Sequence, residues 1–217
     1  MLAREVADLL RTYLDEPDQT VVDDTYLASI LERAYDDFRQ IVVEIDPYVY
    51  ATRVTQTLSN VKEHSLNGVI LGASPLYPKM YQLVDIFEVS PSDATDVRYR
   101  FVPSLEANPR AMAEYSLVGT ELVFFLKQTG TIRIDYIPVQ RINWTTSIGA
   151  GQDVAIDDLD AFHDLIALIA YLQYAILDAA DNPQLLRLME RRQQQLKDYL
   201  SNRSGGIVET VATSDWW

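Results

Sequence analysis

An apolar stretch late in the chain, residues 158–180, most constrains how this protein folds. Its apolar residues fall on every side of a 3.6-residue helix, and such a helix is either buried on most of its circumference or crosses a membrane. Gln173 interrupts the charge-free run of residues 165–177, which is well short of the ~20 residues that a bilayer requires. We therefore predict the central helix of a bundle, beginning at Asp157 and Asp158, whose carboxylates favour a helix N-terminus.

Helical patterns lie on both sides of a segment with a different period. Apolar residues recur at helical spacing over residues 1–14, and again from a predicted cap at Asp23 to the stop at Pro47. A last helix is predicted from Asn182–Pro183, because Pro is favoured at the first helical position. The middle of the chain alternates with period 2, which predicts antiparallel strands with short connections. Strands are predicted at residues 81–89, 97–102, 113–118, 120–126 and 131–137, with tight turns at Gly119 and Gly130.

These patterns predict an α+β protein. A discontinuous α-helical bundle, built from N-terminal and C-terminal helices, carries an inserted antiparallel β domain and an extended C-terminal arm. The predicted boundaries are residues 1–50 and 154–203 for the two parts of the helical bundle, 51–153 for the β domain and 204–217 for the arm.

Composition excludes several classes of function. The 18 basic and 32 acidic residues give a net charge of −14, which disfavours tight binding of nucleic acid over a broad face. The chain contains no Cys, so disulfides, thiolate metal sites and Cys nucleophiles are excluded. Charged residues interrupt the apolar pattern of residues 1–14, which is typical of an amphipathic helix and not of a signal peptide.

No motif supports catalysis, so we expect no catalytic residue, no cofactor and no metal. The Gly149-Ala150-Gly151 sequence lacks the Lys-Ser/Thr of a phosphate loop. His163 stands alone on the central helix, where a packed or capped side chain is the simpler interpretation. The carboxylates of Asp153, Asp157, Asp158 and Asp160 lack the spacing of a calcium-binding loop, and helix capping accounts for two of them.

Charge is divided unevenly along the chain. Residues 1–46 contain four basic and twelve acidic side chains, whereas residues 183–203 contain five basic and two acidic ones. The basic helix either neutralises acidic neighbours in its own bundle or makes a contact between unlike faces of two subunits. The predicted subunit-interface residues are Leu165, Ile169, Leu172 and Ile176 on the central helix, whose excess of apolar faces predicts cover by a neighbouring subunit, and Arg187, Arg191 and Arg192 on the basic helix.

The C-terminal segment has the composition of a docking arm. It follows Ser204-Gly205-Gly206 and ends in two tryptophans, which are enriched among residues that dominate interface energies. The alternative is a frayed terminus that happens to be apolar. We predict that the arm binds a partner protein, by strand addition to a sheet edge. The predicted partner-binding residues are Ile207, Val208, Val211, Trp216 and Trp217.

Four stretches resemble the bacteriophage head–tail adaptor (connector) proteins, in the larger type that has a β insertion between helices. They are distributed over residues 9–200, while residues 60–80 match nothing recognisable. The stretches are LLRTYLDEPDQTVVDDTYLASILERAYDDF, YSLVGTELVFFLKQTGTIRIDYIP, DVAIDDLDAFHDLIALIAYLQYAI and PQLLRLMERRQQQLKDYL.

The resemblance implies a structural virion protein that is not an enzyme. It implies a homo-oligomeric ring, typically of twelve copies, assembled in the host cytoplasm and located beneath the portal protein at the head–tail interface. DNA passes through the lumen during ejection without specific binding, tail or neck proteins attach below, and no membrane is involved. The arm is then expected to reach the portal.

Two other classes stay open at this point. One is a different non-enzymatic oligomeric protein, such as a neck, stopper or scaffold protein. The other is a metal-dependent enzyme, which a pocket joining Asp157, Asp158 and His163 would favour.

Overall fold

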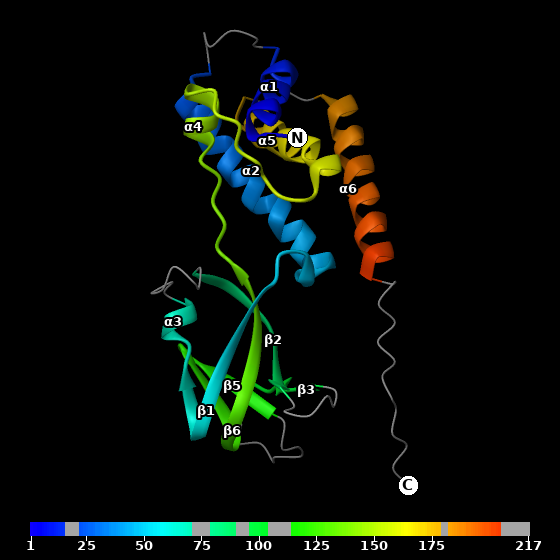
Figure 1. Ribbon diagram of the computed structural model, residues 1–217. Helices are drawn as coiled ribbons and strands as arrows, with labels where there is room; N and C mark the ends of the chain where they lie inside the picture. Colours follow the sequence, from blue (N-terminus) through cyan, green and yellow to red (C-terminus); the bar gives the residue numbers. More distant parts are fainter. Residues whose placement is uncertain (16–21, 71–78, 90–95, 104–113, 179–181, 205–217) are drawn as a thin grey trace. The chain divides into compact units, whose positions relative to one another are not determined.

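The protein has a mixed α+β structure, as the sequence predicts (Figure 1). The computed structural model describes residues 1–15, 22–70, 79–89, 96–103, 114–178 and 182–204. They belong to two compact units. The helical unit combines Met1–Asp46 with Arg141–Trp217, and the β unit comprises Pro47–Gln140.

Local capping signals determine where several helices of the helical unit begin. The side chain of Asp23 accepts a hydrogen bond from the Tyr26 backbone N–H, which starts the second helix as predicted. Asn182 accepts bonds from the backbone N–H groups of Gln184 and Leu185, which starts the last helix. The helices are α1 Ala3–Tyr13, α2 Asp24–Ile45, α4 Trp144–Gly149, α5 Asp164–Asp178 and α6 Pro183–Ser204, with a short 3₁₀ turn at Asp160–Phe162.

Helix α5 is the central helix of its unit. It contacts α1, α2 and α6, and every side chain from Leu165 to Ala170 is buried. The helix begins six residues later than the predicted start at Asp158. Instead of capping α5, the Asp157 carboxylate accepts the backbone N–H of Leu159 at 2.9 Å. The chain then forms the 3₁₀ turn before α5 begins.

The β unit is built around one long strand, β6 Glu121–Pro138. Strand β1 pairs with one edge of β6, while β2 and β5 pair with successive parts of the other edge. Strand β3 pairs with β2 and strand β4 with β5, so the sheet curls back on itself and is nearly closed. The remaining elements are β1 Thr52–Ser65, α3 Asn67–Ile70, β2 Met80–Val89, β3 Val97–Arg98, β4 Arg100–Phe101, β5 Glu114–Val118 and a 3₁₀ turn at Pro47–Val49.

The strands differ from the prediction in two respects. Gly130 was expected to make a tight turn, but it lies inside β6 opposite Leu58, where its φ of +126° favours glycine. The two predicted strands at residues 120–126 and 131–137 are therefore one continuous strand. In addition, β4 and β5 are parallel, whereas all pairings were expected to be antiparallel.

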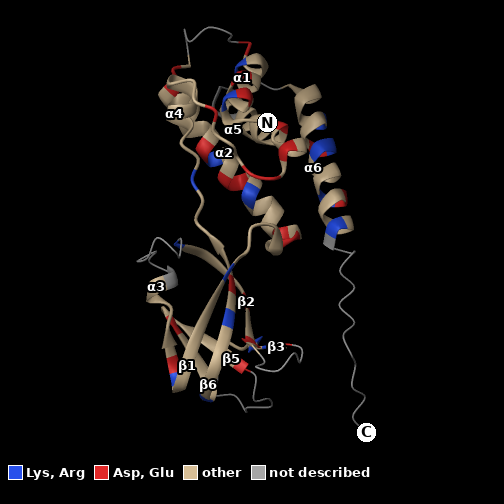
Figure 2. Cartoon of the chain, in the orientation of Figure 1, with Lys and Arg blue, Asp and Glu red and all other residues tan. Residues whose placement is uncertain are grey.

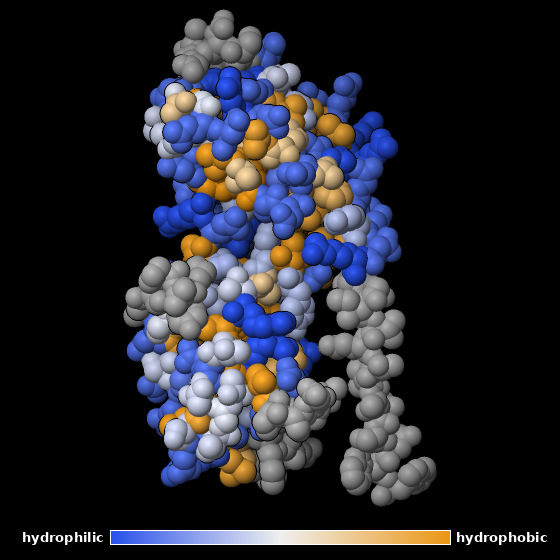
Figure 3. Space-filling view, in the orientation of Figure 1, coloured by the Kyte–Doolittle hydropathy of each residue, from blue (hydrophilic) through white to orange (hydrophobic). Residues whose placement is uncertain are grey.

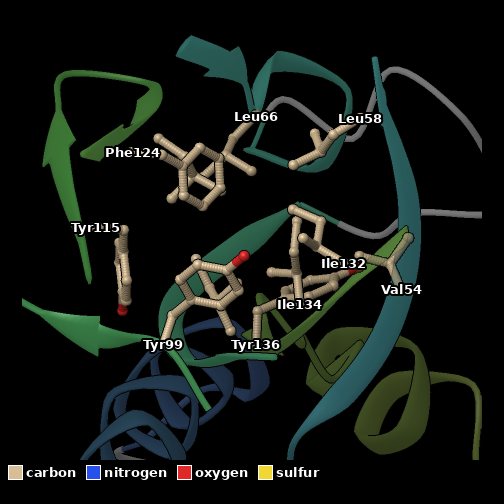
Figure 4. Packing of buried hydrophobic residues seen from close by; sticks show 11 residues of the cluster. Val54, Leu58, Leu66, Tyr99, Tyr115, Phe124, Ile132, Ile134 and Tyr136 are labelled. Atoms are coloured by element: carbon tan, nitrogen blue, oxygen red, sulfur yellow. The ribbon is translucent and has the colours of Figure 1, made fainter. Parts of the chain in front are cut away.

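Aromatic and aliphatic side chains of the curled sheet form the core of the β unit (Figure 4). Tyr99, from the bridging segment between β3 and β4, packs edge-on against Phe124 of β6, with ring centroids 5.4 Å apart. The cluster comprises Val54, Leu58, Leu66, Ile86, Tyr99, Tyr115, Leu122, Phe124, Ile132, Ile134 and Tyr136.

Candidate interaction surfaces

The apolar circumference of α5 is covered by helices of its own chain. Leu165 is fully buried and Ile169 is 6% exposed, so neither side chain presents a surface to a second subunit. Leu172 is half-buried, and the side chain of Ile176 lies outside the described residues. Leu165 and Ile169 therefore need no cover from a neighbouring subunit, because α1, α2 and α6 supply it.

Arg192 joins α6 to the start of α5 within the helical unit. Its guanidinium makes a bidentate pair with Asp164, at 2.7 Å from Nε to Oδ2 and 2.6 Å from Nη2 to Oδ1. It also donates to the backbone oxygen of Ala161 and lies 5.5 Å from the ring centre of Phe162. For Arg192, the structure thus supports neutralisation inside the bundle instead of the predicted subunit contact.

Replacing Arg192 with alanine is expected to lower the free energy of unfolding by about 2 kcal/mol. The change removes a partly buried, charge-assisted pair and leaves the Asp164 carboxylate without its cation. The matched control is Arg191→Ala, because Arg191 is exposed on the same helix and should change stability by less than about 0.5 kcal/mol. Urea unfolding followed by circular dichroism measures both values, and equal values for the two variants would contradict the assignment.

The outer face of the first half of α6 combines cations with an exposed apolar residue. Arg187 and Arg191 are exposed and lie one turn apart, and Leu188 is 36% exposed. Within the described part of the chain, neither arginine has an ion pair. We call Arg187, Leu188 and Arg191 the α6 ridge. Figure 2 shows the basic residues along α6 and the acidic residues along α2.

A groove of about 380 Å³ opens between α2 and the segment that leads into α4. Ala28, Ile142 and Trp144 contribute apolar lining, and the polar lining includes Glu32 and Arg141. We call this cavity the α2–α4 groove. Its lining residues come from positions more than a hundred residues apart in the sequence, so no local pattern predicts it.

Negative charge is concentrated beside this groove. Asp36 is exposed one turn after Glu32, and partial desolvation together with the Glu32 carboxylate raises the pKa of Asp36 above its usual value. Arg39 and Arg141 act in the opposite direction without cancelling the effect. The groove side of α2 therefore holds carboxylates that a further cation would stabilise.

His163 is buried in the helical unit and both of its ring nitrogens have polar partners. It is completely buried, with Nδ1 at 3.0 Å from the backbone oxygen of Met1 and Nε2 at 2.6 Å from Oδ1 of Asp157. A carbonyl oxygen only accepts hydrogen bonds, so Nδ1 donates to Met1 and Nε2 faces the Asp157 carboxylate. Neither His163, Asp157 nor the exposed Asp158 lines the α2–α4 groove.

Two buried carboxylates of the β unit lie directly opposite each other. Asp85 of β2 and Asp135 of β6 are register partners. Asp85 accepts hydrogen bonds from Tyr48 and Arg98, while Asp135 pairs with Arg53 at 3.0 Å. Burial, reinforced by the bond to Asp85, raises the pKa of the Tyr48 hydroxyl above its usual value. Because Tyr48 and Arg53 come from the start of the β unit and Asp135 from its end, this network fastens the two ends together.

A second cavity of about 400 Å³ lies within the β unit. Its lining includes Arg100, Tyr115 and the half-exposed Phe101, which stacks edge-on against Tyr115 at 5.6 Å. This cavity adds an exposed aromatic and basic surface that the sequence analysis did not identify.

The remaining predictions concern metal binding, membrane crossing and the C-terminal segment. Among the described residues, no group of three or more His, Asp or Glu side chains is arranged to hold a metal ion. No helix in the described ranges has the length and apolarity needed to cross a membrane. The predicted partner-binding residues Ile207, Val208, Val211, Trp216 and Trp217 lie outside the described residues.

The sequence matches no protein-family model and no curated protein.

Proposed function

We propose that this chain is a head–tail adaptor, a non-enzymatic structural protein that forms a ring between the portal and the tail of a bacteriophage. The observation that carries the proposal is the division of the chain: both ends build one helical unit, and a contiguous β unit is inserted between them. The adaptors that the sequence resembles have this order of parts. In this proposal the two units are the discontinuous helical bundle and the inserted β domain of such a protein.

Surface chemistry supports the same proposal. The helical unit has acidic and basic helices together with apolar surface on the face seen in Figure 3, a combination suited to protein contacts. The net charge of −14 suits a ring whose lumen DNA traverses, because an acidic wall repels the phosphate backbone and disfavours adhesion. The partners are then other copies of the chain, the portal protein, tail or neck proteins, and DNA in transit. The location is the virion, after assembly in the host cytoplasm.

Electron microscopy tests the proposal directly. The purified full-length protein is imaged alone and after mixing with the portal protein of the same virus. Rings with an open centre, or ring-shaped additions on one end of the portal, are the expected result. Class averages that show only single copies in both samples would overturn the proposal, as would the absence of this chain from purified virions by mass spectrometry.

A further inference from the structure

The α6 ridge has the chemistry of a protein interface with no cover from its own chain. Its two arginines lack ion pairs within the described residues, and Leu188 between them is exposed. Arginine flanking an aliphatic side chain is a combination favoured in protein contacts, because the guanidinium offers several donors and its stem packs against apolar groups. The rest of α6 is held by Leu196 and Leu200, which are fully buried. The ridge therefore sits on an anchored helix.

The α2–α4 groove has the complementary chemistry. Its apolar lining, with Ile142 and Trp144, suits one aliphatic side chain, and Glu32 suits a cation beside it. Arg141 acts on Asp36, while Glu32 has no ion pair within the described residues. The groove thus combines a carboxylate without an ion pair in the described part of the chain and apolar surface beside it.

The ridge and the groove lie on different flanks of the helical unit. Helix α4 packs against α1 and α2, whereas α6 packs against α5 and α2, and Figure 1 shows α4 and α6 on opposite sides of the unit. A chain therefore presents both surfaces at once and can use each with a different neighbour. A contact between two different patches is head-to-tail, and it closes into a ring when the rotation between copies allows.

We propose that the α6 ridge of one copy docks in the α2–α4 groove of the next copy. Leu188 packs on the apolar floor of the groove, and Arg191 pairs with Glu32 across the interface. This inference rests on the proposed ring and names the surfaces that build it. Salt should weaken the contact, because part of its attraction is between charges near the surface.

Charge reversal with rescue tests the docking in the full-length protein. Glu32→Arg and Arg191→Glu are each expected to raise the concentration for half-assembly at least tenfold, measured by mass photometry and sedimentation velocity. Each reversal places like charges opposite each other across the interface. The double variant restores an opposite-charge pair with the two charges exchanged. Its concentration for half-assembly should return to within about threefold of the parent's.

The control pair reverses charges on the same two helices outside both surfaces. Glu44→Arg and Arg203→Glu alter exposed residues near the ends of α2 and α6. The concentration for half-assembly of these variants should stay within about threefold of the parent's. Circular dichroism melting confirms that all variants fold. Two results would show that the docking is wrong while the ring stands, provided that the parent assembles. In one, the double variant assembles no more readily than the single variants; in the other, the single variants assemble as readily as the controls. A parent that stays a single copy, alone and with the portal, overturns the ring and the docking together.

Discussion

Replacing Ile169 with aspartate is expected to unfold the helical unit. Ile169 is 6% exposed in the middle of α5, whose apolar sides contact α1, α2 and α6. A carboxylate there loses the transfer free energy of the isoleucine and buries a charge in the apolar middle of α5, a cost of about 5 kcal/mol. That amount is comparable with the whole stability of many domains. Circular dichroism at 222 nm should show loss of most helical signal at 25 °C.

Leu188→Asp is the matched control for this prediction. Leu188 is an aliphatic residue on α6 and is 36% exposed, so its replacement should keep the helical signal and cooperative melting. The near-ultraviolet signal of the tyrosines in the β unit should survive Ile169→Asp, because the two units are separately compact. A folded, ring-forming Ile169→Asp variant would show that α5 is not the buried centre of its unit.

If this chain is the proposed adaptor, truncation after Ser204 is expected to weaken its binding to the portal by at least a hundredfold while leaving the melting curve unchanged. The removed segment contains Trp216 and Trp217 beyond Gly205-Gly206. A tryptophan at an interface hot spot contributes roughly 2–4 kcal/mol, so the loss of two exceeds the ~2.7 kcal/mol that a hundredfold change requires. In a ring the loss is larger, because each arm held near its site binds at high effective concentration.

The full-length variant with Trp216→Ala and Trp217→Ala separates the tryptophans from the rest of the arm. It should show most of the effect of truncation in a mass-photometry titration with the portal. A variant with Thr210→Ala and Thr213→Ala keeps both tryptophans and should bind like the parent. Portal binding of parental strength by the truncated protein would show that this segment is an ordinary terminus.

Features governed by neighbouring residues were predictable from the sequence. Asp23 and Asn182 cap α2 and α6 because a short polar side chain reaches a backbone N–H two or three residues onward. The start of α5 was not predictable in this way. Asp157 has the composition of a cap, but its carboxylate is engaged by His163 and Leu159. That arrangement depends on the packing of His163 against the backbone of Met1, which no local pattern reveals.

The β unit shows the same limit. Glycine between two alternating runs normally indicates a turn, but Gly130 continues β6 because Leu58 of β1 lies opposite it in the ladder. The partner strand therefore decides between turn and strand, and that partner is distant in sequence. For the same reason, the parallel pairing of β4 with β5 was missed, since it depends on how the sheet curls.

The sequence predicted the basic character of one candidate surface, but it did not predict which individual residues form the surfaces. The excess of basic residues in α6 was evident, yet two adjacent arginines have opposite roles: Arg192 is held by Asp164, and Arg191 faces outward. Helical periodicity separates their directions by about 100°, but only the position of Asp164 shows which one is paired. The α2–α4 groove required the structure, because Glu32 and Trp144 come together only after the helical unit has folded.

The insertion of the β unit has a consequence for the order of folding during synthesis. Helices α1 and α2 emerge from the ribosome first, but their core partner α5 follows only after the whole β unit. The β unit is contiguous, so it can fold while α5 is still being made. Because Thr52 of β1 pairs with Tyr136 of β6, a folded β unit brings its two ends together and turns a long insertion into a short connection. The entropy cost of closing the helical unit then falls, and the β unit guides the assembly of the helices that flank it.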